Sequence, residues 1–539
     1  MTAANIGLCN TCRARVPAEF FNRQGQVWIR KDCPSCGPTE SLVSSDAQRW
    51  QAKRDLWPYA PDKPQHCTLN CDRCQVDHKP NMVFLDVTNR CNMNCPICIA
   101  TIRGMGFDFH PPMAYFEKIF AALGKMNPRP VVQLFGGEPT LREDLLEIIQ
   151  VARRHGIKPH VTTNGVRLAD EEYCRTLCEA GVPMRFAFDG SDGDIYERLR
   201  RNRKAGEKKL QALANLKKHS RRRQTIIACA AKGVNDQHIG ELIQFCHDNR
   251  DLISDIGIIP LTENWEPGTF DAAVHTTMED VEKMVQQSVP EGQVEFIPAG
   301  LSYILKKPRS FFRSNPRSET LLLAGVHPNC ESVTLLISNG KYYRSISHCL
   351  KKPFSRAAVE LAAVCKRIEP RLDRLDPTKR FQRLRGQLLL IVALAPWVLG
   401  TVKLARVFGE GIADLARSLK ARLSGRTAAP AGMPQRRPRR ILRLAMLPFE
   451  EQHSVDAVRM ESCKAVFAYE DPADGKIKTI PACLWYPYRN DILKGLSAKY
   501  GVVGRPASAP SPDNAGGTPT AEPAAVNPPP ATAADALPR

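Results

Sequence analysis

Residues 83–98 read Val83-Phe-Leu-Asp86-Val-Thr-Asn-Arg90-Cys91-Asn-Met-Asn-Cys95-Pro-Ile-Cys98. A short apolar run therefore leads directly into three cysteines that are separated by three and then by two residues. Three thiolates at this spacing can hold three irons of a [4Fe–4S] cluster and leave the fourth iron without a protein ligand. Taken alone, the pattern is also compatible with a zinc site or a purely structural cluster.

The run at 83–87 is the first of six short apolar runs that alternate with amphipathic helical segments. The other runs lie at 131–135, 160–163, 184–188, 225–230 and 256–260, and two clear helical segments lie at 141–155 and 170–180. Six β–α alternations predict an α/β fold whose parallel sheet forms a partial (β/α)6 barrel, short of an eight-fold one. Barrels of this kind assemble their sites at the carboxyl ends of the strands.

The next three runs end in turns that suit such a site. The second run continues into Gly136-Gly137-Glu138-Pro139-Thr140, the third ends in Thr163-Asn164-Gly165, and the fourth ends in Phe188-Asp189-Gly190. Glycines let the backbone approach a ligand closely. Together with the three cysteines after the first run, these turns resemble the radical S-adenosylmethionine (radical SAM) superfamily.

That resemblance implies that Cys91, Cys95 and Cys98 hold a [4Fe–4S] cluster whose open iron binds S-adenosylmethionine. An electron passed through the cluster then cleaves the cofactor to methionine and a 5′-deoxyadenosyl radical. In the family, the Gly-Gly-Glu-Pro turn binds the amino group of the methionine. We expect the cofactor-binding residues to be Gly136, Gly137, Glu138, Pro139, Thr163, Asn164 and Asp189. The electron would come from a donor such as ferredoxin or flavodoxin.

The N-terminus carries two Cys-x-x-Cys turns, Cys9 with Cys12 and Cys33 with Cys36. Paired turns of this kind bind one tetrahedral metal through four sulfurs, so we predict a zinc-ribbon or rubredoxin-like module. Zinc and iron both fit four thiolates. We expect the metal to stabilise the fold, and an electron relay is the alternative.

A second group of cysteines lies just before the first apolar run. Cys67, Cys71 and Cys74 are spaced like cluster ligands, with His78 close behind. They predict a further [4Fe–4S] cluster, with His78 or a distant cysteine as its fourth ligand. A zinc knuckle is the alternative.

Two more cysteine pairs bracket predicted hairpins near the C-terminus. Cys330 and Cys349 flank a turn at Asn339-Gly340, and Cys463 and Cys483 flank a turn at Asp474-Gly475. Two such hairpins could present four thiolates to another cluster. The remaining cysteines are predicted to be buried thiols: Cys174, Cys178, Cys229, Cys246 and Cys365.

The combination of motifs narrows the resemblance. The N-terminal cysteine module, the group at 67–74, the two motifs of the predicted barrel and the closing stretch Ile480-Pro-Ala-Cys483-Leu-Trp-Tyr resemble the tetraether lipid synthase family, whose archaeal members were earlier labelled pterin methyltransferases. In that family, hydrogen is abstracted from an unactivated methyl of a lipid chain and a new C–C bond is formed. The resemblance implies a lipid substrate. The spacing from Cys74 to His78, the segment 351–445 and the Pro/Ala tail depart from the family and leave the substrate open.

The positive charge of the chain is concentrated in one segment. The formal net charge is +20, and residues 351–443 hold 22 Lys and Arg residues against six Asp and Glu residues, an excess of 16. A basic block of this kind predicts a polyanionic partner, either nucleic acid or an anionic membrane surface. Grooves that bind single-stranded nucleic acid alternate basic residues with aromatic residues, and this segment shows no such alternation. The sequence therefore favours an anionic membrane surface as the partner.

The same segment contains the apolar run 387–400, which is shorter than the ~20 residues that span a bilayer and is interrupted by Pro396. We therefore predict an in-plane membrane element with its cations on lipid phosphates and Trp397 at the headgroup level. Leu404, Phe408, Ile412, Leu415, Leu419 and Leu423 continue it at helical spacing, with Arg406, Arg417, Lys420, Arg422 and Arg426 beside them. A span over 388–408 and a buried helical hairpin with solvated cations are the alternatives.

These observations divide the chain into seven predicted parts. They are a metal module at 1–50, a linker with cysteines at 51–80, the partial barrel at 81–262, a substrate or auxiliary region at 263–350, the basic insertion at 351–445, a cysteine domain at 446–503 and a disordered tail at 504–539. The N-terminus lacks a secretory signal, and clustered cysteines suit a reducing compartment, so we expect a cytoplasmic enzyme on the inner membrane face.

Two other functions stay open at this point. The same radical step could act on RNA, a peptide or a pterin. Alternatively, the chain could be a metal-dependent binding or electron-transfer protein whose barrel no longer reacts.

Overall fold

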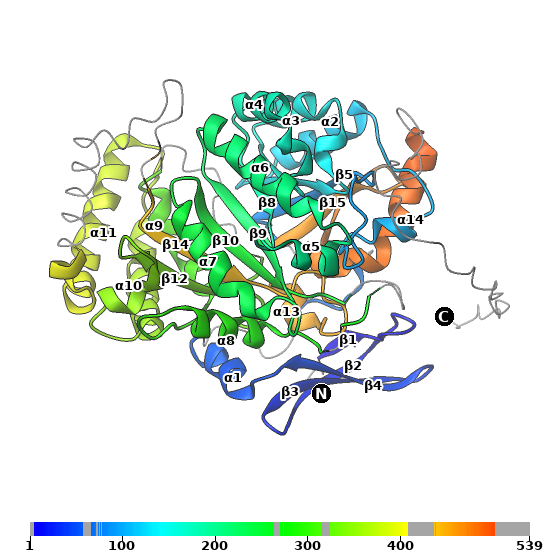
Figure 1. Cartoon of the computed structure of the whole chain (residues 1–539). Coiled ribbons are helices and arrows are strands. Elements are labelled where there is room, and N and C mark those ends of the chain that lie inside the picture. The colour runs from blue at the N-terminus through cyan, green and yellow to red at the C-terminus, as the bar shows by residue number, and fades with distance from the viewer. Residues whose placement is uncertain are drawn as a thin grey trace. The chain divides into compact units, whose positions relative to one another are not determined.

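The six predicted strands are present, in the predicted order, in the computed structural model of the chain (Figure 1). The structure describes residues 5–57, 66–71, 74, 76, 78–263, 270–272, 274–313, 324–407, 436 and 438–501. The predicted tail at 504–539 and the predicted helical residues from Phe408 to Arg426 lie outside the described residues.

One mixed sheet forms the centre of the fold. Its strands are β5 (Met82–Thr88), β6 (Val131–Gly136), β7 (Lys158–Thr163), β8 (Met184–Ala187), β9 (Gln224–Ala230), β10 (Ile253–Pro260), β11 (Ile297–Pro298), β12 (Ser332–Ser338), β13 (Tyr343–Ser345), β14 (Ile441–Met446), β15 (Ala465–Glu470) and β16 (Ile477–Pro481). The strand order is β11-β12-β14-β10-β9-β8-β7-β6-β5-β15-β16, and β13 pairs with β12.

The parallel part of this sheet is longer than the six predicted strands. Strand β14 pairs in parallel with β10 at one side, and β15 pairs in parallel with β5 at the other. The sheet therefore has eight neighbouring parallel strands, with antiparallel strands outside them. The predicted boundary at residue 445 falls inside β14, and β15 belongs to the central sheet.

The described helices are α1 (Ala47–Asp55), α2 (Met113–Gly124), α3 (Leu145–Arg154), α4 (Glu171–Glu179), α5 (Gly193–Arg200), α6 (Lys204–His219), α7 (Ile239–Asp248), α8 (Met278–Ser288), α9 (Lys306–Ser310), α10 (Phe354–Asp373), α11 (Arg380–Thr401), α13 (Ala457–Glu461) and α14 (Ala482–Tyr500). Short 3-10 helices are η2 (Ile102–Gly104), η3 (Pro139–Leu141), η4 (Val166–Ala169), η5 (Asp236–His238), η6 (Ala299–Leu305) and η7 (Ile346–Cys349). Figure 1 shows α2, α3, α4 and α6 lying along one side of the parallel strands.

The amphipathic pattern of these helices explains how they pack. Helix α3 buries Leu145, Ile148, Ile149 and Ala152, which recur at helical spacing on one face. Strands β5 and β6 are buried along almost their whole length, as expected for parallel strands that are covered on both faces.

Aromatic stacking joins the C-terminal elements to the first strand. The ring of Phe84 on β5 stacks on Phe467 of β15 with centroids 5.2 Å apart, and Phe467 stacks on Trp485 of α14 at 5.1 Å. The indole N–H of Trp485 donates a 2.8 Å hydrogen bond to Asp86 at the end of β5. These contacts anchor α14 beside the start of the cysteine loop.

The N-terminal module is an antiparallel sheet of β1 (Ile6–Leu8), β2 (Arg15–Arg23), β3 (Gln26–Cys33) and β4 (Gly37–Ser44). It is followed by α1, whose buried Lys53 ammonium lies 2.7 Å from Glu279 and 2.9 Å from Glu282 on α8. Gly7 of β1 forms an antiparallel bridge with Asp456. The module, with α1, therefore contacts helix α8 and the residue that precedes α13.

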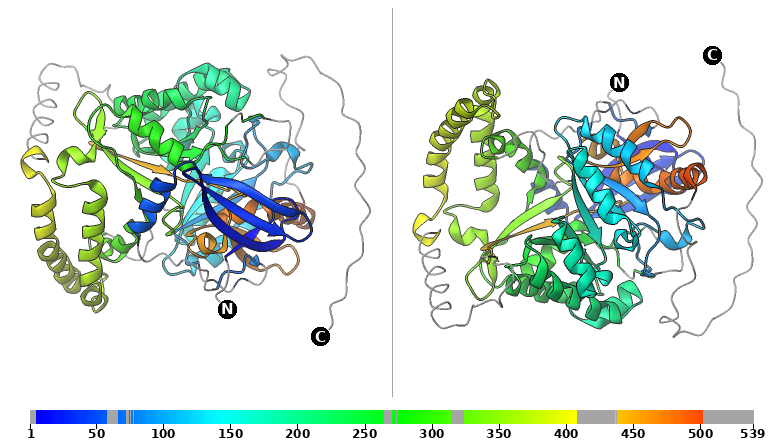
Figure 2. Two further views of the ribbon diagram at one scale, coloured as in Figure 1. Left: turned by 90° about the horizontal axis from the view of Figure 1, so that it is seen from below. Right: turned by 90° about the horizontal axis from the view of Figure 1, so that it is seen from above.

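The basic segment forms a helical hairpin of α10 and α11, which run side by side (Figure 2). Only one face of α11 is packed, around the buried Leu390. Helix α11 ends at Thr401, and the indole N–H of the half-buried Trp397 donates a 3.0 Å hydrogen bond to the carbonyl of Ala357 on α10. The membrane roles of this hairpin and of Trp397 stay predictions.

Candidate functional site

The three predicted cluster ligands share one cavity. Cys91, Cys95 and Cys98 follow β5 and line a cavity of about 270 Å³ at the carboxyl ends of the parallel strands. The cavity wall also includes Gly136, Gly137, Thr163 and Asn164. The structure therefore brings together the motifs that follow β5, β6 and β7.

The residues before the first cysteine fasten the cysteine loop to the following segment. Asn89 accepts a 2.8 Å hydrogen bond from the N–H of Phe109 and donates one of 2.6 Å to the carbonyl of Phe107. The guanidinium of Arg90 contacts both carboxylate oxygens of Asp108, at 2.6 Å for the shortest pair. These bonds fix the backbone that leads into Cys91.

The two glycines of the second turn are required by close backbone contacts. Gly136 has a φ of +113°, a conformation that side-chain-bearing residues rarely adopt. A Cβ atom on Gly137 would lie 2.2 Å from the carbonyl oxygen of Arg90. The N–H of Gly137 instead donates a 2.7 Å hydrogen bond to the carbonyl of Thr88. The turn is thereby held against the start of the cysteine loop.

The carboxylate of Glu138 holds the second and third turns together. It is fully buried and accepts hydrogen bonds from Thr140 Oγ1 at 2.6 Å, Thr163 Oγ1 at 2.7 Å and the N–H of Asn164 at 2.6 Å. Burial raises its pKa in spite of these bonds. Glu138 thus positions the turns, and the glycine backbone faces the cavity. Pro139 and Thr140 lie buried in η3 behind it.

Asn164 connects the third turn to the cysteine loop. Its amide nitrogen donates a 2.8 Å hydrogen bond to Asn92 Oδ1 and lies 3.8 Å from Cys91 Sγ. Its carbonyl oxygen accepts from the N–H of Val166 at 2.9 Å. A residue predicted to bind the cofactor therefore contacts the sulfur of a predicted cluster ligand.

Asp189 forms a buried ion pair with Arg200, a residue that sequence reasoning missed. The two carboxylate oxygens lie 3.0 and 3.1 Å from the guanidinium, and the N–H of Cys229 donates a further 2.9 Å bond. The Arg200 guanidinium overcomes the effect of burial and lowers the pKa of Asp189. Arg200 itself lines the cavity and places a positive charge near Cys95. No motif around Arg200 signals this role.

The donor set fits an iron–sulfur cluster. Burial raises the pKa of the Cys91 and Cys95 thiols, and the thiol of Cys98 raises both further. Such thiols stay protonated unless a metal stabilises their thiolates. Three sulfurs on one cavity wall, with open space beside them, suit a cluster that keeps one iron for another ligand.

Away from the three cysteines, the cavity is lined by charged side chains that the sequence analysis did not predict. Arg443 of β14 lies 2.9 Å from Asp255 of β10, and both line the cavity with Arg185 and Glu331. Burial lowers the pKa of Arg185 to about 10. These residues come from strands that are distant in sequence, so no local pattern could predict their meeting.

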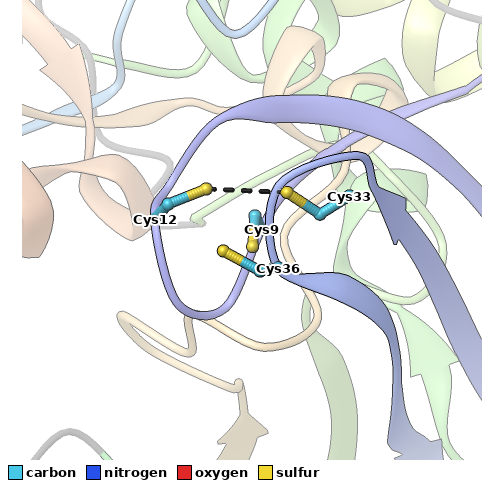
Figure 3. A group of neighbouring side chains, drawn as sticks. All are labelled: Cys9, Cys12, Cys33 and Cys36. Atoms are coloured by element: carbon cyan, nitrogen blue, oxygen red, sulfur yellow. Dashed lines mark hydrogen bonds between the residues drawn. The ribbon is translucent and has the colours of Figure 1, made fainter. Parts of the chain in front are cut away.

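The N-terminal cysteines form the predicted four-sulfur group (Figure 3). The sulfurs of Cys9, Cys12, Cys33 and Cys36 all lie within 4.8 Å of one another, and Cys12 Sγ lies 3.6 Å from Cys33 Sγ. Hydrogen bonds from the N–H groups of Cys12 and Thr11 lower the pKa of Cys9 to about 6. A low thiol pKa favours the thiolate that a metal needs.

Comparison with known proteins agrees with this geometry. Residues 85–246 match the radical SAM superfamily, and residues 4–45 match the HMPTM N-terminal zinc ribbon domain. The chain therefore contains a radical SAM domain. Its expected cofactors are thus a [4Fe–4S] cluster that binds S-adenosylmethionine at Cys91, Cys95 and Cys98, with an additional metal in the zinc ribbon.

Individual relatives of this radical SAM enzyme can be named. It is 28% identical over 361 residues to the 7,8-dihydro-6-hydroxymethylpterin dimethyltransferase of Methanocaldococcus jannaschii, an alignment that covers 62% of this chain and 68% of that protein. It is 30% identical over 191 residues to the GTP 3′,8-cyclase of Marinobacter nauticus, covering 34% and 55%. Among solved structures, SuiB of Streptococcus suis bound to S-adenosylmethionine matches with a TM-score of 0.32 at 13% identity, covering 52% and 69%.

The second cysteine group of the radical SAM enzyme lies beside the end of β16 and the start of α14. Cys67, Cys71, Cys74 and His78 line one small cavity, and Cys74 Sγ lies 3.8 Å from His78 Nε2. Burial raises the pKa of Cys67 to about 11, with a further contribution from Cys74. The predicted ligand set is therefore gathered in one place, including the histidine.

The C-terminal cysteines are brought together only in part. The predicted hairpins are present as β12 with β13 and β15 with β16. Cys463 and Cys483 are buried, and Cys330 is half-buried. Desolvation raises the pKa of Cys330 well above its usual range, and the neighbouring Cys463 and Cys483 raise it further. Cys349 lies in η7, where its carbonyl accepts from the N–H of Lys403 after α11. A fourfold group with Cys349 stays a prediction.

Proposed function

We propose that this enzyme abstracts hydrogen from an unactivated C–H bond of a lipid alkyl chain at the cytoplasmic membrane surface, for C–C coupling or another functionalisation. When bound, the cluster and S-adenosylmethionine would supply the 5′-deoxyadenosyl radical that performs the abstraction. Ferredoxin or flavodoxin would supply the electron. The residues of the chain would bind the cofactor, orient the substrate and exclude water.

The observation that carries this proposal is the unpacked apolar face of α11. Among the described residues, α11 is the helix that is long and apolar enough to cross a membrane, with a mean hydropathy of 1.5 in its most apolar window and 17% of that window buried. Leu388, Ile391, Val392 and Leu399 are 55%, 58%, 72% and 60% exposed. Exposed apolar side chains in such number mark a surface for lipid or a partner.

Charges beside this face support a membrane surface. Lys379, Arg380 and Arg385 are exposed at the start of α11, where they can reach lipid phosphates. Pro396 and the end of the helix at Thr401 favour an element that lies in the plane of the headgroups. Each such cation contributes about 1 kcal/mol near an anionic leaflet.

The lining of the cavity supports an alkyl substrate. Near the cluster ligands the wall is mainly apolar, with Ile97, Phe135, Ile227, Ile259 and Phe449 among its side chains. An alkyl chain has no polar group to hydrogen-bond, so such a wall binds it through burial alone. The fixed turns at Gly137 and Asn164 would keep the cofactor at one end of this wall.

A pterin is the second candidate substrate. The relative from Methanocaldococcus jannaschii is named as a pterin dimethyltransferase. The ion pair of Arg443 and Asp255, together with the buried Glu331, gives the cavity donors and acceptors that could pair with a heterocycle edge. This candidate needs no membrane element.

An isotope experiment separates the two candidates. The anaerobically reconstituted enzyme would be incubated with S-adenosylmethionine, a reductant and membrane lipids deuterated in their alkyl chains. The lipid proposal predicts deuterium in 5′-deoxyadenosine. Unlabelled 5′-deoxyadenosine, together with methylation of 7,8-dihydro-6-hydroxymethylpterin in a parallel reaction, would reject the lipid proposal in favour of the pterin.

A further inference from the structure

Two histidines and a glutamate converge at a place that belongs to none of the cysteine groups. His275 precedes α8, while Glu451 and His453 lie in the loop between β14 and α13. One ligand atom from each side chain lies within 4.8 Å of the other two. Two imidazole nitrogens and one carboxylate oxygen are a ligand set that binds zinc with three protein ligands.

Two of the imidazole nitrogens at this site have no hydrogen-bond partner among the described residues. Among the described residues, His275 Nε2 and His453 Nε2 are buried and have no hydrogen-bond partner. The two rings meet edge to face with centroids 4.7 Å apart. Buried ring nitrogens without partners are rare, because an unmet hydrogen bond destabilises the folded protein.

A second carboxylate orients one of the histidines. Glu263 Oε1 lies 2.8 Å from His275 Nδ1, which places the ring proton on Nδ1 and leaves the Nε2 lone pair directed at the site. A carboxylate bound to the far nitrogen of a histidine ligand is the usual arrangement around protein-bound zinc.

The two carboxylate oxygens of Glu451 have different neighbours. Its Oε2 accepts a hydrogen bond from Ser454 and lies 3.9 Å from the guanidinium of Arg459. Its Oε1 lies 3.7 Å from His453 Nε2, too far for a hydrogen bond. Two ligands of a tetrahedral zinc ion stand roughly 3.3 Å apart, close to this separation.

We propose that His275, Glu451 and His453 bind a zinc ion, with Glu263 positioning His275. Three protein ligands leave a fourth position for water or for an oxygen atom of a ligand. His275, His453 and Glu263 line a cavity of about 470 Å³ whose wall also includes Cys9 and Arg13 of the zinc ribbon. The site is therefore accessible from a space that the zinc ribbon borders.

A plain polar cluster is the competing explanation. It would satisfy His453 by a hydrogen bond to Glu451, yet their separation of 3.7 Å leaves that bond unmade. It would also give His275 Nε2 a partner, and the described residues supply none. A zinc ion satisfies both nitrogens and the carboxylate at once.

The test uses the full-length protein, purified anaerobically with its clusters and dialysed against Zn²⁺. Elemental analysis should find two zinc ions per chain, and zinc-edge X-ray absorption should show about two sulfurs and about two nitrogen or oxygen ligands per zinc on average. One zinc ion in an all-sulfur environment would overturn the proposal. Both measurements are made on the unaltered protein.

Variants then assign the ligands. The His275→Ala/His453→Ala protein should hold half as much zinc, all of it bound by sulfur, whereas His238→Ala on η5 should match the unaltered protein. Glu263→Gln should weaken the affinity of the second zinc about 10–100-fold in a chelator competition. Unchanged zinc content in the double variant would contradict the assignment.

Discussion

The backbone N–H of Glu138 donates a 2.8 Å hydrogen bond to the carbonyl oxygen of Arg90, the residue directly before Cys91. The turn after β6 therefore holds the cysteine loop through the backbone itself. The bond is possible because Gly137 has no side chain where that carbonyl approaches. The geometry of the cluster loop thus depends on a glycine in another turn.

Gly137→Ala should displace the cysteine loop, because its Cβ would meet the carbonyl oxygen of Arg90 at 2.2 Å. We expect the reconstituted variant to lose most of the iron bound at Cys91, Cys95 and Cys98. It should also form 5′-deoxyadenosine at least about 100-fold more slowly, because a displacement of about 1 Å in a reacting group can lower the rate by that factor. The measurement is iron content with 5′-deoxyadenosine formation. Gly400→Ala is the matched control, since a Cβ atom at that position would meet no atom within 4 Å; equal behaviour of both variants would refute this role of Gly137.

His110→Gln should make the protein less sensitive to acid. Burial, aided by the cations of Arg142 and Arg90, lowers the pKa of His110 to about 4, whereas an unfolded histidine titrates near about 6.5. Between these values the unfolded chain binds more protons, so stability falls as the pH falls from about 6.5 to about 4. The neutral glutamine removes this term, which amounts to at most about 1.4 kcal/mol per pH unit.

Denaturant unfolding under anaerobic conditions across this pH range measures the effect. The unfolding free energy of His110→Gln should decline less steeply with falling pH than that of the unaltered protein. His238→Gln, in a half-exposed position, should follow the unaltered protein. Parallel curves for all three proteins would show that His110 does not contribute to acid sensitivity.

Replacing Leu388, Ile391 and Val392 by serine should weaken binding to vesicles that contain anionic lipids. The three side chains are exposed, so the protein should keep its fold, while the lost apolar contact should reduce affinity at least about tenfold. Vesicle co-sedimentation measures the change. Ile441→Ser, which alters an exposed apolar residue on β14, is the control. Undiminished vesicle binding by the triple variant would count against α11 as the membrane element.

The sequence predicted those features that depend on local patterns. The six strands β5 to β10 follow from apolar runs and helical periodicity, and the zinc ribbon follows from two Cys-x-x-Cys turns. The parallel pairing of β14 with β10 and of β15 with β5 was not predicted. The spacing of apolar residues within a strand does not show which other strand it pairs with. Arg200 was missed for a similar reason, because it lies at the end of α5 and forms no recognisable motif with its partner Asp189.

The roles of individual polar residues were the least predictable. Glu138 and Asp189 were expected at the cofactor, and the structure shows that their carboxylates are occupied by Asn164 and Arg200. His275 and His453 lie far apart in the sequence, so no ligand spacing drew attention to them. Such sites become visible only when the fold brings their atoms together.

The central claim is that Cys91, Cys95 and Cys98 hold the cluster that cleaves S-adenosylmethionine. The most direct measurement is the rate of 5′-deoxyadenosine formation by the Cys91→Ala protein, loaded with iron and sulfide without oxygen and supplied with a reductant. We predict that this rate falls to the background of the protein-free reaction, because two thiolates cannot hold the cluster with one open iron. A rate equal to that of the unaltered protein would contradict the account.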